Sequence, residues 1–236
     1  MRLPPYGTML CVNAPVASLP TVAPVPDVLA DLEWRGLVAL STDLEVLRQA
    51  LAAAPVTLYC GFDPTGDSLH IGNLVPVFAL RRFQLAGHRP IALVGGATGL
   101  IGDRGGRTAE RQLLDAETIG RRVGLLSAQM RQFLAWGDEA PGAVLVDNLD
   151  WTAGLTVIDF LRDVGKHFPV NQMLARDSVS GRLASGGLSF TEFSYQLLQS
   201  LDFLELHRRF GCTLQVGATD QWGNITAGLE LIRRVA

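Results

Sequence analysis

The chain has 236 residues, of which 48% are hydrophobic, which is enough to bury the core of one domain without requiring a second. Its net charge of −3 gives no overall basic field, which weighs against a protein that binds nucleic acid over its whole surface. The three cysteines, Cys11, Cys60 and Cys212, are odd in number and far apart in the sequence. This pattern excludes a disulfide framework and a cysteine metal site, and it favours a reducing, cytoplasmic setting.

The first 26 residues are rich in proline and poor in charge. A signal peptide needs an unbroken apolar stretch after a basic start, and the prolines interrupt any such stretch here. We therefore expect a disordered arm over residues 1–26 and an ordered domain over residues 27–236. No apolar run approaches the roughly 18 residues of a spanning helix, so no membrane association is predicted. The scattered histidines predict no metal site.

The ordered part should begin with a short helix and a turn, followed by a helix over residues 41–53. In that helix Leu44, Leu47 and Leu51 recur at helical spacing, and Ser41 or Thr42 can cap it. An apolar strand is predicted next, over residues 56–62.

A turn rich in Asp, Pro, Gly and Ser joins this strand to a long helix, predicted over residues 68–86. Pro76 lies inside the helix and should bend it or open one hydrogen bond. The helix carries His70 in its first turn, where unpaired backbone N–H groups and the helix dipole favour a phosphate. A second apolar strand follows at residues 91–94, and this β-α-β order predicts a parallel sheet covered on both faces.

The next turn, residues 95–107, is rich in glycine and contains Asp103. It has neither the Lys-Ser/Thr ending of a Walker A loop nor the glycine spacing of a dinucleotide site. The turn would allow close backbone approach to a ligand at the sheet edge. A plain glycine-rich turn with a solvated Asp103 remains the alternative.

The rest of the chain continues the alternation of helices and strands. A helix over residues 109–134 leads to a strand at 143–146 that ends in Asp147 and Asn148. Helices are predicted at 155–164 and 170–175, a mobile loop at 178–187, a short strand at 214–216 and a last helix at 220–235. The fold class is therefore α/β, with a doubly wound parallel sheet.

A helix predicted over residues 191–203 has a polar stripe on an otherwise apolar surface. Tyr195, Gln199 and Asp202 lie at positions i, i+4 and i+7. The three side chains either satisfy one another, face solvent, or line a pocket for a polar ligand. Asp220, near the end of the chain, is either a plain helix cap or a contact for a ribose hydroxyl.

The segment YCGFDPTGDSLHIGNL resembles the first signature of class I aminoacyl-tRNA synthetases, the His-Ile-Gly-His element, here His70-Ile71-Gly72-Asn73. Within that class the chain is similar to the bacterial tyrosyl-tRNA synthetases. The resemblance runs from about Leu29 to the last residue and is densest at residues 59–74, 95–103, 190–203 and 215–230.

This resemblance implies a Rossmann-like nucleotide-binding catalytic domain in a tyrosine–tRNA ligase. Such an enzyme activates L-tyrosine with ATP to tyrosyl-adenylate and transfers it to tRNA(Tyr). ATP is then a substrate, accompanied by Mg²⁺ and by no organic cofactor. The family also implies a cytoplasmic homodimer joined through the catalytic domain.

The resemblance assigns roles to tyrosine-binding residues. Tyr59 and Asp202 match the residues that hold the phenolic hydroxyl of the substrate. Asp103, Tyr195 and Gln199 match those that hold its ammonium group. Gln215 and Gln221 match polar residues around its carboxylate.

The resemblance also assigns an ATP side to the site. Thr65 and His70 match the catalytic groups that stabilise the ATP phosphates, and Asp220 matches a ribose contact. None of these groups needs to be a nucleophile, since the enzyme's work is positioning and charge stabilisation. The full ATP-binding set implied by the resemblance is Gly61, Asp63, Pro64, Thr65, His70, Gly72, Asn73 and Asp220.

The sequence departs from the family pattern at three places. Asn73 replaces the second histidine, and Arg104–Gly105 stands where Pro-Ser is common. No Lys-Met-Ser-Lys-Ser-like element precedes Ala236, so we expect a catalytic portion without the lysine loop and the anticodon-binding domains. We expect such a portion to bind tyrosine but to activate it poorly on its own. A truncated homologue that serves as a tyrosine- or nucleotide-binding interaction module is the alternative from another class, and a tryptophan-specific relative is a third.

Overall fold

The computed structural model describes residues 26–101, 114–174, 179 and 189–235. Asp103, Arg104–Gly105, the first 25 residues and, apart from Val179, the predicted loop at 178–187 lie outside this part. The described chain begins with α1 (Val28–Trp34) and α2 (Leu44–Ala53). The predicted start of the second helix is wrong by three residues, because Asp43 caps α2 by accepting a hydrogen bond from Val46 N.

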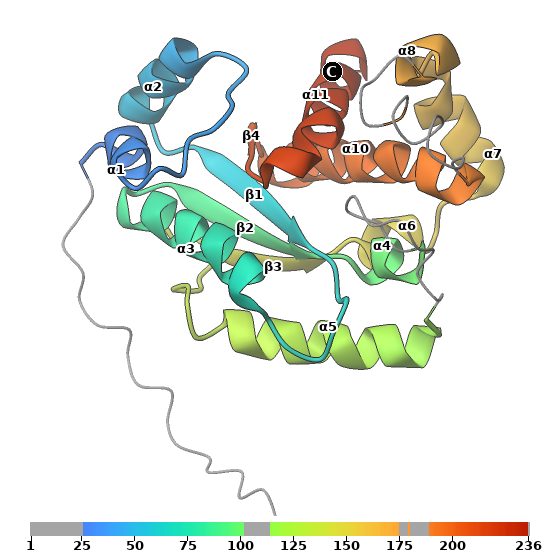
Figure 1. Ribbon diagram of the computed structural model, residues 1–236, viewed down its shortest axis with the longest axis horizontal. Coiled ribbons are helices and arrows are strands. Elements are labelled where there is room, and N and C mark those ends of the chain that lie inside the picture. Colours follow the sequence, from blue (N-terminus) through green and yellow to red (C-terminus); the bar gives the residue numbers. More distant parts are fainter. Residues whose placement is uncertain (1–25, 102–113, 175–178, 180–188, 236) are drawn as a thin grey trace, which may run out of the picture.

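The described strands form one parallel sheet in the order β3-β2-β1-β4 (Figure 1). The strands are β1 (Thr57–Phe62), β2 (Arg89–Val94), β3 (Val144–Asp147) and β4 (Leu214–Gln215). Strand β1 pairs with β2 along its whole length and with β4 through Leu58 and Tyr59. The predicted α/β fold with a parallel sheet is confirmed.

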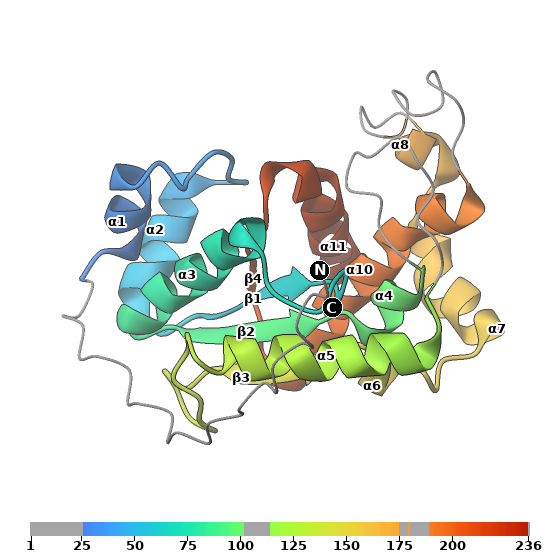
Figure 2. The same cartoon turned by 60° about the horizontal axis from the view of Figure 1, so that its bottom comes forward.

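Side chains that alternate along β1 divide the core between the two faces of the sheet. Leu58, Cys60 and Phe62 pack on the face covered by α3 (Ile71–Leu85) and α5 (Ala116–Met130). Tyr59 packs on the opposite face, under α10 (Phe190–Phe210). Figures 1 and 2 show helices on both sides of the sheet, which is the doubly wound arrangement.

Two helices start later than predicted. Helix α3 begins at Ile71 with His70 in the N-cap position, three residues beyond the predicted start, and it contains Pro76. Helix α5 begins at Ala116, where Asp115 accepts a hydrogen bond from Thr118 N, and ends at Met130. Residues 102–113 lie outside the described part, so the predicted helix start at 109 falls there.

Between β2 and α10 the chain forms a series of short helices. The helix predicted at 155–164 is divided into α7 (Val157–Asp159) and the π-helical turn η1 (Phe160–Val164). The other short helices are α4 (Gly96–Ile101), α6 (Leu149–Thr152), η2 (Gly165–His167) and α8 (Val170–Leu174). Helix α4 shows that the turn predicted over residues 95–107 is wrong for residues 96–101.

The last segment is also corrected in detail. After β4 comes a short 3-10 turn, η3 (Thr219–Gln221), and then α11 (Trp222–Val235). Asp220 therefore lies inside η3, where Ala218 takes the N-cap position, and it does not cap the final helix.

The strand order places a switch point between β1 and β4. After β1 the chain forms β2 and then β3, which both lie on one side of β1 in the sheet. Strand β4, which comes last in the sequence, pairs with the other side of β1. In open parallel sheets the crevice at such a point, outside the carboxyl ends of the strands, is where ligands bind. Within the described residues no helix is long and apolar enough to cross a membrane.

Candidate active site

Polar residues and glycines follow the ends of three neighbouring strands. Asp63 follows β1, Gly95 and Gly96 follow β2, and Asp147 with Asn148 closes β3. Because the strands are parallel, these residues share the carboxyl edge of the sheet.

The glycines after β2 are required by how closely side chains approach the turn. A Cβ atom on Gly95 would lie 2.2 Å from both Asp63 Oδ1 and Thr98 Oγ1. A Cβ atom on Gly96 would lie 2.3 Å from Asp147 Oδ1, which accepts a hydrogen bond from Gly96 N at 3.0 Å. The turn is therefore glycine-rich for packing against this polar cluster.

A continuous set of hydrogen bonds links α10 to the ends of the strands. The Tyr195 hydroxyl donates to Asp63 Oδ2 and the Thr98 hydroxyl donates to Asp63 Oδ1, both at 2.8 Å. Asn148 Nδ2 donates to Thr98 Oγ1 at 3.1 Å, and Asn148 Oδ1 accepts from Ala97 N at 2.8 Å. These contacts fix the position of α10 relative to the sheet edge.

The same network ends on a buried carboxylate, Asp202. Asn148 Nδ2 donates to Asp202 Oδ2 at 3.0 Å and Trp151 Nε1 donates to Asp202 Oδ1 at 2.9 Å. Burial raises the pKa of Asp202 to about 7, an effect that these two donors oppose and that the charges of Asp63 and Asp147 strengthen. Three acidic side chains, Asp63, Asp147 and Asp202, therefore lie near one another in this part of the site.

Tyr59 lies beside this carboxylate with its hydroxyl unpaired. The side chain is 1% exposed, and its ring centroid lies 5.3 Å from that of Phe203. The hydroxyl has no hydrogen-bond partner among the described residues. Burial raises the pKa of Tyr59 well above its ordinary value, and the charge of Asp202 adds to this, so the hydroxyl keeps its proton.

Two amide oxygens in the predicted tyrosine set are also buried without a partner. They are Gln199 Oε1 on α10 and Gln215 Oε1 on β4. Gln221 lies in η3, where its Oε1 accepts from Asn224 Nδ2 at 3.0 Å. The structure thus connects Tyr195 and Asp202 through one hydrogen-bond network and places Tyr59, in the middle of β1, near Asp202.

The predicted phosphate side lies at the start of α3. His70 and Thr65 are exposed, and Asn73 Oδ1 accepts from His70 N at 3.1 Å. Asn73 at the third helical position therefore closes the helix start. A Cβ atom on Gly72 would lie 3.0 Å from the His70 ring, so Gly72 lets the ring sit over the first turn.

The remaining predicted residues are dispersed around this edge. Pro64 is buried, and a Cβ atom on Gly99 would lie 2.8 Å from its Cγ. Gly61 is exposed on β1, Asp220 is exposed in η3, and Asp103 lies outside the described residues. The sequence reasoning did not select Thr98, Asn148 or Trp151, although Asn148 stands directly after a predicted strand, where ligand-binding polar groups are common.

A doubly wound parallel sheet with a polar carboxyl edge and a helix N-terminus beside it defines the class of nucleotide-binding α/β domains. A family model described as tRNA synthetases class I (W and Y) matches residues 51–236. The chain belongs to this family of class I tRNA synthetases.

The chain is similar to several curated and solved proteins. It is 60% identical over 210 residues to a tyrosine–tRNA ligase of Acidothermus cellulolyticus, covering 88% of this chain and 49% of that protein. It is also 60% identical over 210 residues to the tyrosine–tRNA ligase of Streptomyces coelicolor, again covering 49% of the relative. A C-terminally truncated mitochondrial tyrosyl-tRNA synthetase of Coccidioides posadasii matches with a TM-score of 0.77 and 31% identity, over 89% of this chain and 59% of that one. The chain spans about half the length of the curated relatives it matches.

Proposed function

We propose that this chain carries the amino-acid-activating site of a tyrosine–tRNA ligase. The enzyme would join L-tyrosine to ATP to form tyrosyl-adenylate and then transfer the tyrosyl group to tRNA(Tyr). The curated relatives at about 60% identity carry the name tyrosine–tRNA ligase, which supports tyrosine over tryptophan as the substrate.

The observation that carries the proposal is a set of buried polar atoms without partners. Tyr59 Oη, Gln199 Oε1 and Gln215 Oε1 are buried and have no hydrogen-bond partner among the described residues. Buried polar atoms are normally paired, so unpaired ones on β1, its neighbour β4 and the covering helix α10 support a ligand between these elements. Two further unpaired buried atoms, Arg89 Nε and Gln196 Oε1, lie outside this set. The three atoms belong to residues to which the family resemblance assigns a tyrosine contact.

The phenol of tyrosine fits the deepest part of this site. Its hydroxyl can donate to Asp202, and its oxygen can accept from the unpaired Tyr59 hydroxyl. The hydrogen bonds from Asn148 and Trp151 hold Asp202 in place before the substrate arrives. Phenylalanine would leave both Tyr59 and Asp202 without this partner, which is costly in a buried site.

The polar end of tyrosine fits the residues nearer the strand ends. The ammonium group would donate to Gln199 Oε1 and lie beside Tyr195, with Asp103 as its predicted charge partner. Asp63, which accepts from Tyr195, adds negative charge to the same region. The carboxylate would lie near Gln215 and Gln221, whose amides can turn to present Nε2 donors.

On the ATP side, the tyrosine carboxylate oxygen would attack the α-phosphorus directly. A new bond forms between that oxygen and the phosphorus, and the bond from the phosphorus to the pyrophosphate oxygen breaks. Thr65, His70 and the N-terminus of α3 would stabilise the charge that develops on the phosphate oxygens. Asp220 would contact the ribose, and Mg²⁺ would arrive bound to the ATP phosphates.

We further propose that the enzyme works as a cytoplasmic homodimer. Exposed apolar side chains occur on α7, η1, α8 and at the start of α10, and α7 and α8 lie at one end of the molecule (Figures 1 and 2). Apolar residues gathered in this way favour a protein interface. This surface comprises Val157, Ile158, Leu161, Val170, Leu174 and Phe190, and we call it the α7–α8 surface.

The substitution Asp202→Ala tests the tyrosine site. We expect kcat/KM for tyrosine in ATP–pyrophosphate exchange to fall by roughly 5- to 150-fold, the effect of about 1–3 kcal/mol of lost hydrogen bonding, with a much smaller change for phenylalanine. Asp138→Ala, at an exposed loop position away from the site, is the matched control. Equal losses for tyrosine and phenylalanine would refute the role of Asp202.

A further inference from the structure

The loop between β1 and α3, residues 63–70, carries Thr65 and His70 away from the sheet. Both side chains are exposed, as are those of Asp67 and Ser68. Apart from the buried Pro64 and the partly buried Leu69, the loop has little core packing, so hydrogen bonds from neighbouring elements help to set where its residues lie.

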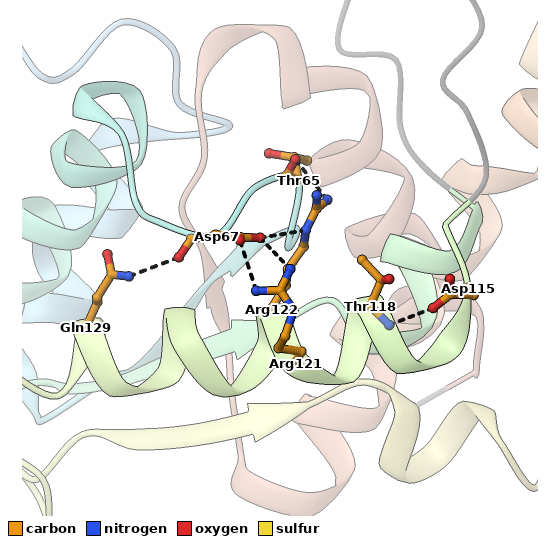
Figure 3. A network of polar contacts seen from close by, with 7 residues as sticks. All are labelled: Thr65, Asp67, Asp115, Thr118, Arg121, Arg122 and Gln129. Atoms are coloured by element: carbon orange, nitrogen blue, oxygen red, sulfur yellow. Dashed lines mark hydrogen bonds and ion pairs between the residues drawn. The ribbon is translucent and has the colours of Figure 1, made fainter. Parts of the chain in front are cut away.

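Helix α5 supplies these hydrogen bonds along the length of the loop (Figure 3). Gln129 Oε1 accepts from Leu69 N at 2.9 Å, and Gln129 Nε2 donates to the Asp67 carbonyl oxygen at 3.3 Å. Arg122 Nη1 donates to the Thr65 carbonyl oxygen at 3.2 Å, and Arg122 Nε donates to Asp67 Oδ1 at 3.1 Å. The backbone of the loop is therefore held at residues 65, 67 and 69.

A second arginine, Arg121, contacts the loop only through the Asp67 carboxylate. It donates Nη1 to Oδ2 at 2.9 Å and Nη2 to Oδ1 at 3.0 Å. The hydrogen bond from Arg121 is the main cause that lowers the pKa of Asp67, so the carboxylate stays ionised and keeps both arginines.

The two arginines differ in how much they can position the loop. The side chains of Arg121 and Asp67 are 54% and 55% exposed, and ion pairs so open to water contribute little. The Arg122 side chain is only 19% exposed and also reaches the backbone of Thr65. Arg122 is therefore the arginine whose loss should displace Thr65.

The helix that carries these side chains is itself well anchored. Arg122 and Gln129 lie seven residues apart, which places them on one face of α5 at a separation of two turns. On α5 Ile119, Leu126 and Met130 are buried, and Asp115 caps its start through Thr118 N at 2.7 Å (Figure 3). The loop is thus held against a fixed support.

We propose that Arg122 and Gln129 are positioning residues for the ATP step. They hold Thr65 and His70 at the N-terminus of α3, where the ATP phosphates would bind; the identity of that ligand rests on the proposed function. Charge stabilisation requires donors that are fixed before the reaction, and a displacement of about 1 Å can cost roughly 100-fold in rate. The two residues contribute through the loop and do not touch the substrate.

Arg122→Ala, with Arg121→Ala as the matched control, tests this proposal. We expect Arg122→Ala to lower kcat/KM for ATP in tyrosine-dependent pyrophosphate exchange by roughly 10- to 100-fold. Its dissociation constant for tyrosine should stay within about twofold of the original, because the tyrosine side of the site is held by α10. Arg121→Ala should change both quantities by less than about twofold. Gln129→Leu removes the hydrogen bonds to Leu69 N and to the Asp67 carbonyl oxygen. It should likewise lower kcat/KM for ATP without changing the affinity for tyrosine.

Hydrogen–deuterium exchange of residues 65–70 supplies a readout that does not depend on activity. Arg122→Ala and Gln129→Leu should accelerate exchange in this loop, whereas Arg121→Ala should leave it close to that of the original chain. Equal effects of Arg121→Ala and Arg122→Ala, or a loss of tyrosine affinity in step with the loss of ATP use, would overturn the inference. A chain that binds no tyrosine would instead refute the proposed function, and loop exchange would still decide the role of Arg122.

Discussion

Tyr59 on β1 and Tyr195 on α10 are both buried tyrosines, but their hydroxyl groups differ. The Tyr195 hydroxyl donates to Asp63 at 2.8 Å, whereas the Tyr59 hydroxyl has no partner among the described residues. A buried hydroxyl without a partner is a cost to the fold, so its presence at the site is better explained by binding than by stability.

The substitution Tyr59→Phe should therefore separate stability from binding. We expect the free energy of unfolding, measured with urea, to stay constant or rise by up to about 1 kcal/mol, because an unpaired buried group is removed. The affinity for tyrosine, measured by calorimetry, should fall by roughly 2- to 10-fold, the effect of about 0.5–1.5 kcal/mol.

Tyr195→Phe is the control for this experiment. It removes a hydroxyl that is paired with Asp63, so we expect the free energy of unfolding to fall by about 1 kcal/mol. If Tyr59→Phe destabilised the protein as much as Tyr195→Phe, the Tyr59 hydroxyl would have a structural partner and the argument for an unpaired ligand contact would be wrong.

The sequence predicts site residues that share one face of a helix, but it does not predict those that distant segments of the chain contribute. Tyr195, Gln199 and Asp202 were selected because they share one face of a predicted helix. Asn148 and Trp151, which hold Asp202, lie more than 50 positions earlier in the chain. Their contacts depend on how β3 and α10 pack, which spacing along the sequence does not reveal.

At the scale of elements, the glycines of the turn after β2 and those of α5 have opposite roles. Gly96 leaves no room for a Cβ atom beside Asp147, while a Cβ atom on Gly120 would meet nothing within 4 Å. Gly120 is also exposed in the interior of a helix, where glycine is unfavourable relative to alanine.

Gly96→Ala and Gly120→Ala should accordingly shift stability in opposite directions. Gly96→Ala forces Asp147 to move, and we expect a loss of about 1–3 kcal/mol in the free energy of unfolding. Gly120→Ala should gain about 0.5–1 kcal/mol, since it limits the unfolded chain and favours the helix. Urea unfolding of the two variants checks both signs, and a stabilising Gly96→Ala would show that the turn can open without cost.

Local patterns predict that the elements exist but not where they end. Helix α10 continues to Phe210, seven residues beyond its predicted end, and α5 ends at Met130, four residues before its predicted end. Apolar runs identified β1 and β2, and helical spacing identified α3 and α10. The start of α3 was placed three residues early because Leu69 N bonds to Gln129, a contact across 60 positions that no local signal announces. The start of α2 was misplaced because Ser41, Thr42 and Asp43 are all good caps, and only the structure shows that Asp43 is used.

At the scale of the whole molecule, the alternation of strands and helices was enough to predict a parallel, doubly wound sheet. It did not predict the strand order, because the pairing of β4 with β1 involves only two residues, Leu214 and Gln215, and depends on how α10 and α11 pack together. The same alternation says nothing about surfaces that meet other chains.

The α7–α8 surface gives a test of self-association. Ile158→Glu places a charge in this surface, and we expect it to raise the dimer dissociation constant at least tenfold, about 1.4 kcal/mol, in analytical ultracentrifugation. Val46→Glu, on the exposed face of α2 at the other end of the molecule, is the matched control. A monomeric starting protein at micromolar concentration, or equal effects of the two variants, would contradict the proposed dimer surface.

The hydrogen bond between Tyr195 and Asp63 spans 132 positions in the sequence, and this has a consequence for synthesis. When β3 has been synthesised, α3 and α5, which cover Leu58, Cys60 and Phe62, have already been synthesised as well. The opposite face, with Tyr59, Ile91 and Leu93, still waits for α10. The growing chain therefore displays an apolar sheet face for the time needed to translate the 63 codons from the end of β3 at Asp147 to the end of α10 at Phe210, at roughly 5–20 residues per second. A chaperone that binds apolar segments should meet this protein at that stage, before α10 covers this face of the sheet.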